Sequence, residues 1–207
     1  MEAIKPALGF MSMDQDAAGG DFSEQLKKIL STGPVNWDFY FLDETGSTMD
    51  VARDLLRRKK CPIFVLAERQ TAGRGRHGRR WISSQTGNIY LTLGLPNFAP
   101  DRDIGPLSTE LAMAIADAFA RQFSIVLKVK LPNDLLLDGA KVGGILLETD
   151  GDGLAVGIGL NLVHDNTLQG QCSQKVTSLQ AAAPLERIAV IPVLCQCVFD
   201  WARPCFP

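Results

Sequence analysis

Residues 130–161 read KLPNDLLLDGAKVGGILLETDGDGLAVGIGLN, three apolar runs separated by turn signals at Asp138-Gly139 and at 150–153. Asp-Gly pairs favour the tight turns of β-hairpins, so the stretch predicts an antiparallel meander. Glycine inside a strand often marks a place where another group lies close against the backbone. Such glycines occur here at Gly143, Gly144, Gly157 and Gly159, with tight strand packing or a bulge as the alternative explanation.

The rest of the chain is predicted to alternate strands and helices around this meander. Apolar runs favour strands at 35–42, 62–67, 88–95 and 124–130. Helical periodicity favours helices at 21–30, 49–60 and 106–123, of which the last is the clearest because its apolar residues form one stripe. Ser47 or Thr48 is a natural N-cap for the helix at 49–60, unless the hydroxyls serve a ligand. A closing helical part is expected from Leu185 on, and Pro192 is expected to kink or end it.

A dense cluster of positive charge lies in residues 68–81, which read ERQTAGRGRHGRRW. Four arginines fall within seven residues, at Arg74, Arg76, Arg79 and Arg80, and Gly73, Gly75 and Gly78 interrupt them. Glycine lets a backbone approach a ligand closely, so we expect a loop that wraps a multiply charged anion through N–H groups and guanidinium forks. A solvated charged loop is the alternative. The glycine spacing also fits the dinucleotide fingerprint, but a turn and a strand follow where that fingerprint needs a helix.

Composition indicates an ordinary globular protein. The 207 residues are 46% hydrophobic and 21% charged, with a formal net charge of -2, and they predict one domain or two. No apolar run is long enough to span a bilayer, and the rest of the chain supplies no basic face for nucleic acid. The five cysteines (Cys61, Cys172, Cys195, Cys197 and Cys205) form no C-x-x-C pair and are expected to be free thiols in a reducing cytosol. Two histidines exclude a His-rich metal site, and Asp150 and Asp152 lack the further ligands of a calcium loop.

Four motifs, preceded by Ser47-Thr48, together resemble the biotin–protein ligase family (biotin–[acetyl-CoA carboxylase] ligases). They are GRGRHGRRW at 73–81, KLPND at 130–134, KVGGILLE at 141–148 and GIGLN at 157–161. The resemblance covers about residues 41–179 and implies an α+β fold, related to class II synthetases and biotinyl/lipoyl transferases. In that fold, helices pack against a central, mostly antiparallel or mixed sheet. Residues 35–207 would form the catalytic domain after a variable lead-in at 1–34. Neither an N-terminal DNA-binding domain nor the family's C-terminal β domain is expected.

The activity implied by this resemblance is adenylation of biotin by ATP with Mg²⁺, followed by transfer to one lysine of a biotin carboxyl carrier domain. It implies a cytoplasmic enzyme, monomeric or weakly dimeric, with no nucleic-acid or membrane partner. Two alternatives stay open: a lipoate or octanoate ligase of the same fold, and a non-catalytic biotin-binding relative. The loop at 73–79 argues against the first, and the full set of cations argues against the second.

The resemblance also implies roles for single residues. The catalytic candidates are Lys141, Arg76 and Lys130. The candidates for biotin binding are Ser47, Thr48, Gln70, Gly73, Arg74, Gly75, Arg76, Lys141 and Gly144. The candidates for nucleotide binding are Arg76, Arg79, Trp81, Asn133 and Asn161, and no protein-held metal site is expected. An exposed lysine near a hairpin turn is the alternative reading of Lys141.

The chemistry requires cations at such a site, because a carboxylate must attack an α-phosphate and two anions have to meet. Fixed positive charges and backbone donors lower that barrier where water does not screen them. The sequence departs from the family pattern at two positions: Leu131 stands where the family usually has tryptophan, and Met49 follows Thr48 where it often has asparagine.

Overall fold

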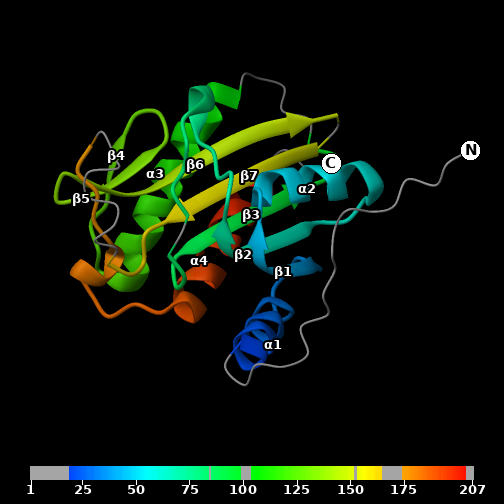
Figure 1. Ribbon diagram of the computed structural model, residues 1–207, viewed down its shortest axis with the longest axis horizontal. Helices are drawn as coiled ribbons and strands as arrows, with labels where there is room; N and C mark the ends of the chain where they lie inside the picture. Colours follow the sequence, from blue (N-terminus) through cyan, green and yellow to red (C-terminus); the bar gives the residue numbers. More distant parts are fainter. Residues whose placement is uncertain (1–18, 84, 99–103, 152, 165–173, 204–207) are drawn as a thin grey trace, which may run out of the picture.

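The computed structural model describes residues 19–83, 85–98, 104–151, 153–164 and 174–203. Within these ranges, one seven-stranded sheet runs in the order β1-β2-β3-β7-β6-β5-β4 (Figure 1). The strands are β1 (Asp38–Thr45), β2 (Ile63–Gln70), β3 (Ile89–Leu95), β4 (Lys128–Lys130), β5 (Asp134–Leu137), β6 (Ala140–Asp150) and β7 (Gly153–Leu160). Only β1 and β2 pair in parallel; the other neighbours are antiparallel. The predicted α+β fold with a mostly antiparallel sheet is therefore confirmed.

Helices cover both faces of this sheet. Helix α2 (Thr48–Arg58) lies over one face, against β2, β3 and β7 (Figure 1). Helices α3 (Ile104–Phe123) and α4 (Arg187–Ala202) pack on the other face, and α1 (Gly19–Leu30) packs against α4. Two short 3₁₀ helices, η1 (Arg76–Gly78) and η3 (Leu179–Ala181), complete the described elements.

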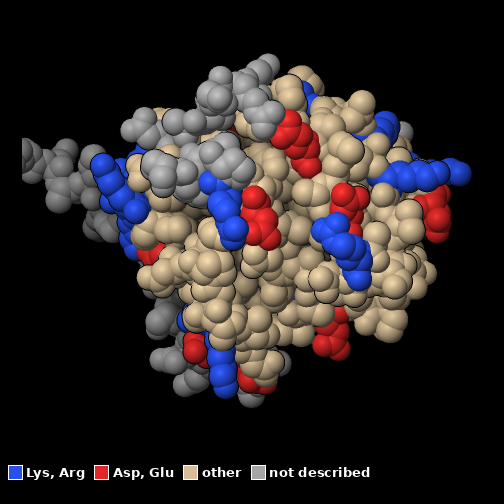
Figure 2. All heavy atoms as spheres, turned by 180° about the vertical axis from the view of Figure 1, so that it is seen from behind, with Lys and Arg blue, Asp and Glu red and all other residues tan. Residues whose placement is uncertain are grey.

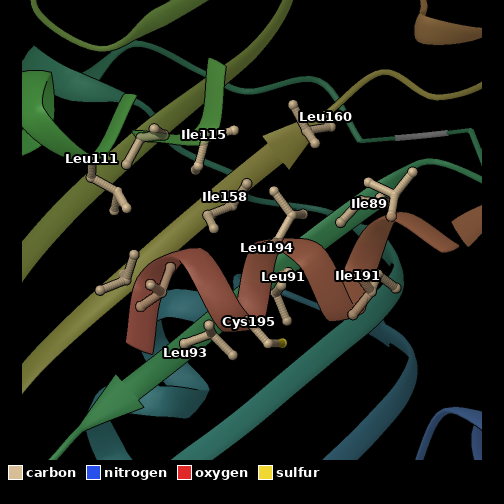
Figure 3. Packing of buried hydrophobic residues seen from close by; sticks show 14 of the residues in the cluster. Ile89, Leu91, Leu93, Leu111, Ile115, Ile158, Leu160, Ile191, Leu194 and Cys195 are labelled. Carbon is tan, nitrogen blue, oxygen red and sulfur yellow. The ribbon is translucent and has the colours of Figure 1, made fainter. Parts of the chain in front are cut away.

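The main core lies between the sheet and the α3–α4 layer. Alternate residues of β3, Ile89, Leu91 and Leu93, point into it because successive side chains of a strand face opposite ways. Ile191 and Leu194 of α4 lie directly against them in Figure 3. Burying these side chains supplies most of the driving force for folding. A smaller apolar cluster under α2 covers the opposite face.

The predicted meander is confirmed as β5, β6 and β7. Asp138 and Gly139 form the first turn with positive φ angles of 50° and 80°, which aspartate and glycine tolerate better than other residues. In β7 the large apolar residues face the main core, and Gly157 and Gly159 occupy the α2 face. Because glycine has no side chain, this alternation leaves a hollow beside the N-terminus of α2.

Three strands differ from the prediction by more than one residue at an end. Strand β2 covers Ile63–Gln70 rather than 62–67. Strand β1 covers Asp38–Thr45 rather than 35–42, because its register follows β2, with Asp38 opposite Ile63 and Thr45 opposite Gln70. Strand β4 is only Lys128–Lys130 rather than 124–130. The residues before it reverse direction at Ser124, whose φ is 56°.

Helices lie at both ends of the described chain. Leu26 and Leu30 of α1 are buried in the main core, so this helix packs with the domain predicted for residues 35–207. Of the two outcomes expected at Pro192, a kink or an end of the helix, the end is wrong, because α4 continues through Pro192 to Ala202. Proline in its second turn removes one backbone hydrogen bond, whereas the flanking Ile191 and Leu194 are fully buried, and that burial outweighs the loss.

Cys61, Cys195 and Cys197 are free thiols, while Cys172 and Cys205 lie outside the described residues. Across the described helices, none combines the length and apolarity that crossing a membrane requires. On the face opposite α2, shown in Figure 2, basic and acidic side chains are scattered over a mostly uncharged surface.

Candidate functional site

The motifs converge on one cavity of about 490 Å³ on the α2 face of the sheet. Its wall combines the start of α2, the arginine-rich loop after β2, and the glycine-containing stretches of β6 and β7. The predicted site residues that line it are Ser47, Thr48, Gln70, Arg74, Gly75, Arg76, Arg79, Trp81, Asn133, Lys141, Gly144 and Asn161. Gly73 and Lys130 were also predicted for the site but do not line it.

A chain of hydrogen bonds fixes the polar end of the cavity. Gln70 Oε1 accepts from Thr48 N at 2.9 Å and from Thr48 Oγ1 at 3.1 Å. On one side Gln70 Nε2 donates to Ser83 Oγ at 3.0 Å, and on the other Thr92 Oγ1 donates to Thr48 Oγ1 at 2.9 Å. Three separate strands or loops therefore hold the Thr48 hydroxyl and the Gln70 amide in fixed positions.

The start of α2 is arranged for the cavity rather than for capping. Ser47 occupies the predicted N-cap position, but its buried hydroxyl makes no capping hydrogen bond. The neighbouring Met49, which has no predicted role, is buried against Gly157: a Cβ at that glycine would lie 2.7 Å from Met49 Sδ. Met49 thus forms part of the cavity wall directly beside Thr48.

Two glycines of the meander, Gly144 and Gly159, make room for the indole of Trp81. A Cβ at Gly159 would lie 2.5 Å from Trp81 Cε2, and one at Gly144 would lie 3.3 Å from Trp81 Cζ3. Lys141 Nζ lies 5.2 Å from the indole centroid, within cation–π range. Trp81 Nε1 is buried and has no hydrogen-bond partner among the described residues. The predicted close approach to the backbone is confirmed, and a side chain of the protein itself makes it.

The arginine-rich loop is a closed arch. Trp81 N donates to Gly73 O at 2.9 Å and Gly75 N donates to Arg79 O at 2.7 Å, so the two arms of the arch are tied together. At its tip His77 and Gly78 have positive φ angles of 57° and 71°. Within the described part of the chain, the guanidinium groups of Arg76 and Arg79 have no carboxylate partner. They remain available to an anionic ligand in the cavity.

Lys141 is not the exposed hairpin lysine that the alternative reading required. Its side chain is 17% exposed, and its ammonium lies 2.6 Å from Asp134 Oδ1. Asp134 also lines the cavity but received no role from the sequence. The sequence did offer a signal for this ion pair. Asp134 ends the motif at 130–134, and the hairpin between that motif and Lys141 pairs β5 with β6, which brings the two side chains close together.

The side-chain amides of Asn133 and Asn161 each donate a hydrogen bond to a backbone carbonyl. Asn133 Nδ2 donates to Ile145 O at 2.5 Å, and Asn161 Nδ2 donates to Thr177 O at 3.3 Å. Both asparagines line the cavity. Lys130 is exposed and donates to Gln174 Oε1 at 3.3 Å, which places it outside the cavity, next to a residue that lines it.

Other lining residues received no role from the sequence, because they carry no polar group or belong to no motif: Ile82, Tyr90, Leu91, Ile145, Leu146, Ile158, Gln174 and Val176. Arg80, the fourth arginine of the loop expected to wrap an anion, lines the cavity as well. Leu131, which replaces the family's usual tryptophan, is 72% exposed and is not among the lining residues.

Comparisons with known proteins show the family and the fold of the chain. The model of the biotin/lipoate A/B protein ligase family matches residues 40–165. A biotin--[acetyl-CoA-carboxylase] ligase of Mycobacterium tuberculosis is 30% identical over 188 residues, which are 88% of this chain and 66% of the relative. The chain thus spans slightly less than two thirds of that protein's length.

Two solved structures share the fold. The biotin protein ligase of Leishmania major in complex with biotinyl-5-AMP has a TM-score of 0.67 and 29% identity, covering 81% of this chain and 75% of the other. The biotin protein ligase of Aquifex aeolicus in complex with biotin and ATP has a TM-score of 0.68 and 26% identity, covering 81% and 72%. With the motifs gathered at one cavity and the family model spanning most of the sheet, the chain belongs to the biotin/lipoate A/B protein ligase family.

Proposed function

We propose that this protein is an ATP-dependent biotin–protein ligase. It would activate biotin as biotinyl-5'-AMP with release of pyrophosphate, and then transfer the biotin to a specific lysine of a biotin carboxyl carrier domain. One observation carries the proposal: a single cavity has a polar end, formed by Thr48 and Gln70, and a cationic mouth, formed by Lys141, Arg76 and Arg79. The relatives and structural neighbours named as biotin ligases support the same assignment.

The polar end suits the ureido ring of biotin, which has both donors and an acceptor. Thr48 and Gln70 offer positioned hydroxyl and amide groups there, and Ser47 adds a second hydroxyl. A lipoyl or octanoyl chain offers no hydrogen-bonding group to these side chains at the corresponding place. This contrast favours biotin over the acyl chains of lipoate and octanoate ligases.

The cationic mouth suits the first half-reaction. An oxygen of the biotin carboxylate attacks the α-phosphorus of ATP, the bond to the bridging oxygen breaks, and pyrophosphate leaves. Lys141 provides a compact charge for the carboxylate and phosphate, and Arg76 and Arg79 provide forked donors for phosphate oxygens. These groups stabilise the charge that develops in the transition state once the arch is ordered over the two ligands.

Mg²⁺ would arrive with the triphosphate. Asp134 is the one carboxylate among the described lining residues, which fits a Mg²⁺ ion that retains most of its water and phosphate ligands. When bound, the ion would neutralise the charge of the leaving pyrophosphate. In the second half-reaction a lysine amine attacks the acyl carbon, AMP leaves, and the arch keeps water away from the mixed anhydride meanwhile.

A transfer assay tests the complete function. The purified protein, biotin, ATP and Mg²⁺ are incubated with a biotin carboxyl carrier domain or with the same domain carrying arginine in place of its acceptor lysine. We expect mass addition of one biotin to the first domain and none to the second. Labelling of neither domain, or equal labelling of both, contradicts the assignment.

The arch is expected to become more ordered when ligands bind. Its seven residues from 74 to 80 carry four like charges, which repel one another until an anion neutralises them. Limited trypsin digestion with and without biotin plus ATP measures this effect at the loop arginines. We expect clear protection by the two ligands together, whereas a solvated loop would be cut at the same rate in both conditions.

Replacing Arg76 by glycine is expected to impair retention of the acyl-adenylate more than its formation. Arg76 has no carboxylate partner in the described residues and lines the cavity, so its charge is free for the intermediate. We expect release to accelerate about tenfold, corresponding to one charge-assisted hydrogen bond. Biotin labelling of an unrelated lysine-rich protein reports the leak. His77→Gly, a change at an exposed position of the same arch that does not line the cavity, should leak less; equal leakage would remove Arg76 from this role.

A further inference from the structure

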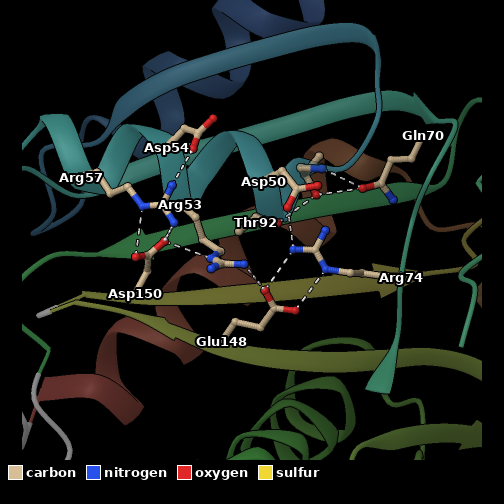
Figure 4. A network of polar contacts seen from close by, with 10 residues as sticks. Asp50, Arg53, Asp54, Arg57, Gln70, Arg74, Thr92, Glu148 and Asp150 are labelled. Atoms are coloured by element: carbon tan, nitrogen blue, oxygen red, sulfur yellow. Dashed lines mark hydrogen bonds and ion pairs between the residues drawn. The ribbon is translucent and has the colours of Figure 1, made fainter. Parts of the chain in front are cut away.

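Arg74 is the centre of a charged network that lies beside the cavity (Figure 4). Its guanidinium binds Glu148 of β6 with two hydrogen bonds, from Nε at 3.1 Å and from Nη2 at 3.0 Å. The same Nη2 lies 2.7 Å from Asp50 Oδ1 of α2. Hydrogen bonding to Glu148, and then to Asp50, raises the pKa of Arg74 above its usual value. Arg74 therefore connects the arch to a strand and to a helix at once.

Glu148 is itself held in place from the other side. Arg53 Nη1 binds Glu148 Oε2 at 3.1 Å, and Arg53 Nε binds Asp150 Oδ2 at 3.1 Å. Glu148 and Asp150 share one face of β6 because they are two residues apart, and that face is the one that α2 covers. An isolated exposed ion pair contributes little, but a bidentate pair within such a network has a fixed geometry. The Glu148 side chain is 25% exposed and that of Arg74 is 27% exposed.

The ion pairs of Arg74 also hold the arch in position. Arg74 is bridged to Arg80 across the arch, and the next residue, Gly75, donates to Arg79 O. Arg76 and Trp81, which line the cavity, follow two and seven residues later in the chain. Their positions thus depend on a guanidinium that is already paired with two carboxylates.

We propose that Glu148, together with Asp50, is a positioning residue that holds the ligand-binding arch against β6 and α2 through Arg74. Without this anchor the arch samples positions that cannot bind, and the observed affinity falls by the fraction of time spent in them. Once biotin and ATP have closed the arch, the reacting groups are the same. Loss of the anchor should therefore raise KM and leave kcat nearly unchanged.

The first test measures the anchor without ligands and without activity. Amide hydrogen exchange is followed by mass spectrometry at Gly75 and Trp81, whose N–H groups close the arch. Glu148→Gln keeps the shape of the side chain and removes its charge. The matched control is Asp150→Asn, which removes a carboxylate two residues along the same strand that binds Arg53 and Arg57 but not Arg74.

We expect exchange at these amides to become about tenfold faster in Glu148→Gln and to stay within about twofold of the parent in Asp150→Asn. Equal exchange in the two variants, or no change in Glu148→Gln, overturns the anchor. If Glu148→Gln does not fold, Asp50→Asn takes its place, because the Asp50 side chain is 59% exposed and its replacement leaves the core intact.

The second test rests on the proposed function and measures KM for biotin and kcat in ATP–pyrophosphate exchange. We expect KM to rise about tenfold in Glu148→Gln with kcat within about twofold of the parent. A fall in kcat with unchanged KM contradicts a positioning role. If the parent shows no biotin-dependent exchange, the proposed function fails, and the amide-exchange comparison still decides whether the anchor exists.

Discussion

Lys141→Ala is expected to slow acyl-adenylate formation by about a hundredfold or more. The ammonium of Lys141 is 17% exposed, lies at the cavity wall and faces the indole of Trp81. Where water is largely excluded, one such charge stabilises the attacking carboxylate and the developing phosphate charge by about 3 kcal/mol. A lysine with only a structural place at the surface would change stability by a few tenths of a kcal/mol and leave the rate unchanged. Single-turnover formation of the adenylate measures the difference.

Two further variants make this prediction specific. Lys141→Arg is not expected to restore the rate, because a planar guanidinium does not fit the compact position beside Asp134. Lys128→Ala removes an exposed lysine of β4 and should behave like the parent. If folded Lys141→Ala forms the adenylate at a rate within about threefold of the parent, the change is no larger than that of an ordinary surface substitution. Lys141 would then not be a catalytic residue.

Gly73→Ala is expected to abolish most ligand binding although Gly73 does not line the cavity. A Cβ at this position would lie 2.7 Å from Trp81 O and 2.9 Å from Ser83 Oγ. The first of these atoms is backbone at the base of the arch, so the arch itself has to shift. A displacement near 1 Å of positioning groups can cost about a hundredfold, and we expect a loss of biotin affinity of that order.

Gly46→Ala is the matched control for this change. Gly46 accepts a hydrogen bond from Ala72 N near the same arch, but a Cβ on it would have nothing within 4 Å. Calorimetric titration with biotin compares the two variants, and thermal unfolding checks that both are folded. Parent-like biotin binding by Gly73→Ala would show that the arch tolerates the added methyl group and that its base is less rigid than the hydrogen bonds indicate.

The sequence predicted the cavity well because its motifs carry local signals. The Asp138-Gly139 turn specified the register of β5 and β6, and that register brings Lys141 to the cavity wall. The glycines of β7 correctly marked a close approach to the backbone. Most predicted site residues line the cavity. Their motifs lie at strand ends or turns, and the sheet brings these ends and turns together beside α2.

The missed features depend on contacts between distant parts of the chain. No local pattern indicates that Trp81 would lie on Gly159, 78 positions away, or that Arg74 would bind Glu148. The predicted start of β1 was wrong because partner strands, not propensity, set its ends. Lys130 was placed in the site by its motif, yet the strand turns its side chain toward solvent.

Biotin-dependent exchange of pyrophosphate into ATP tests the central claim most directly, because it isolates the first half-reaction and needs no carrier protein. The protein is incubated with ATP, Mg²⁺ and labelled pyrophosphate, with biotin, lipoate or octanoate supplied separately. Biotin is predicted to support exchange, and lipoate and octanoate are predicted not to. Exchange with lipoate or octanoate as fast as with biotin, or no exchange with biotin, would contradict the account.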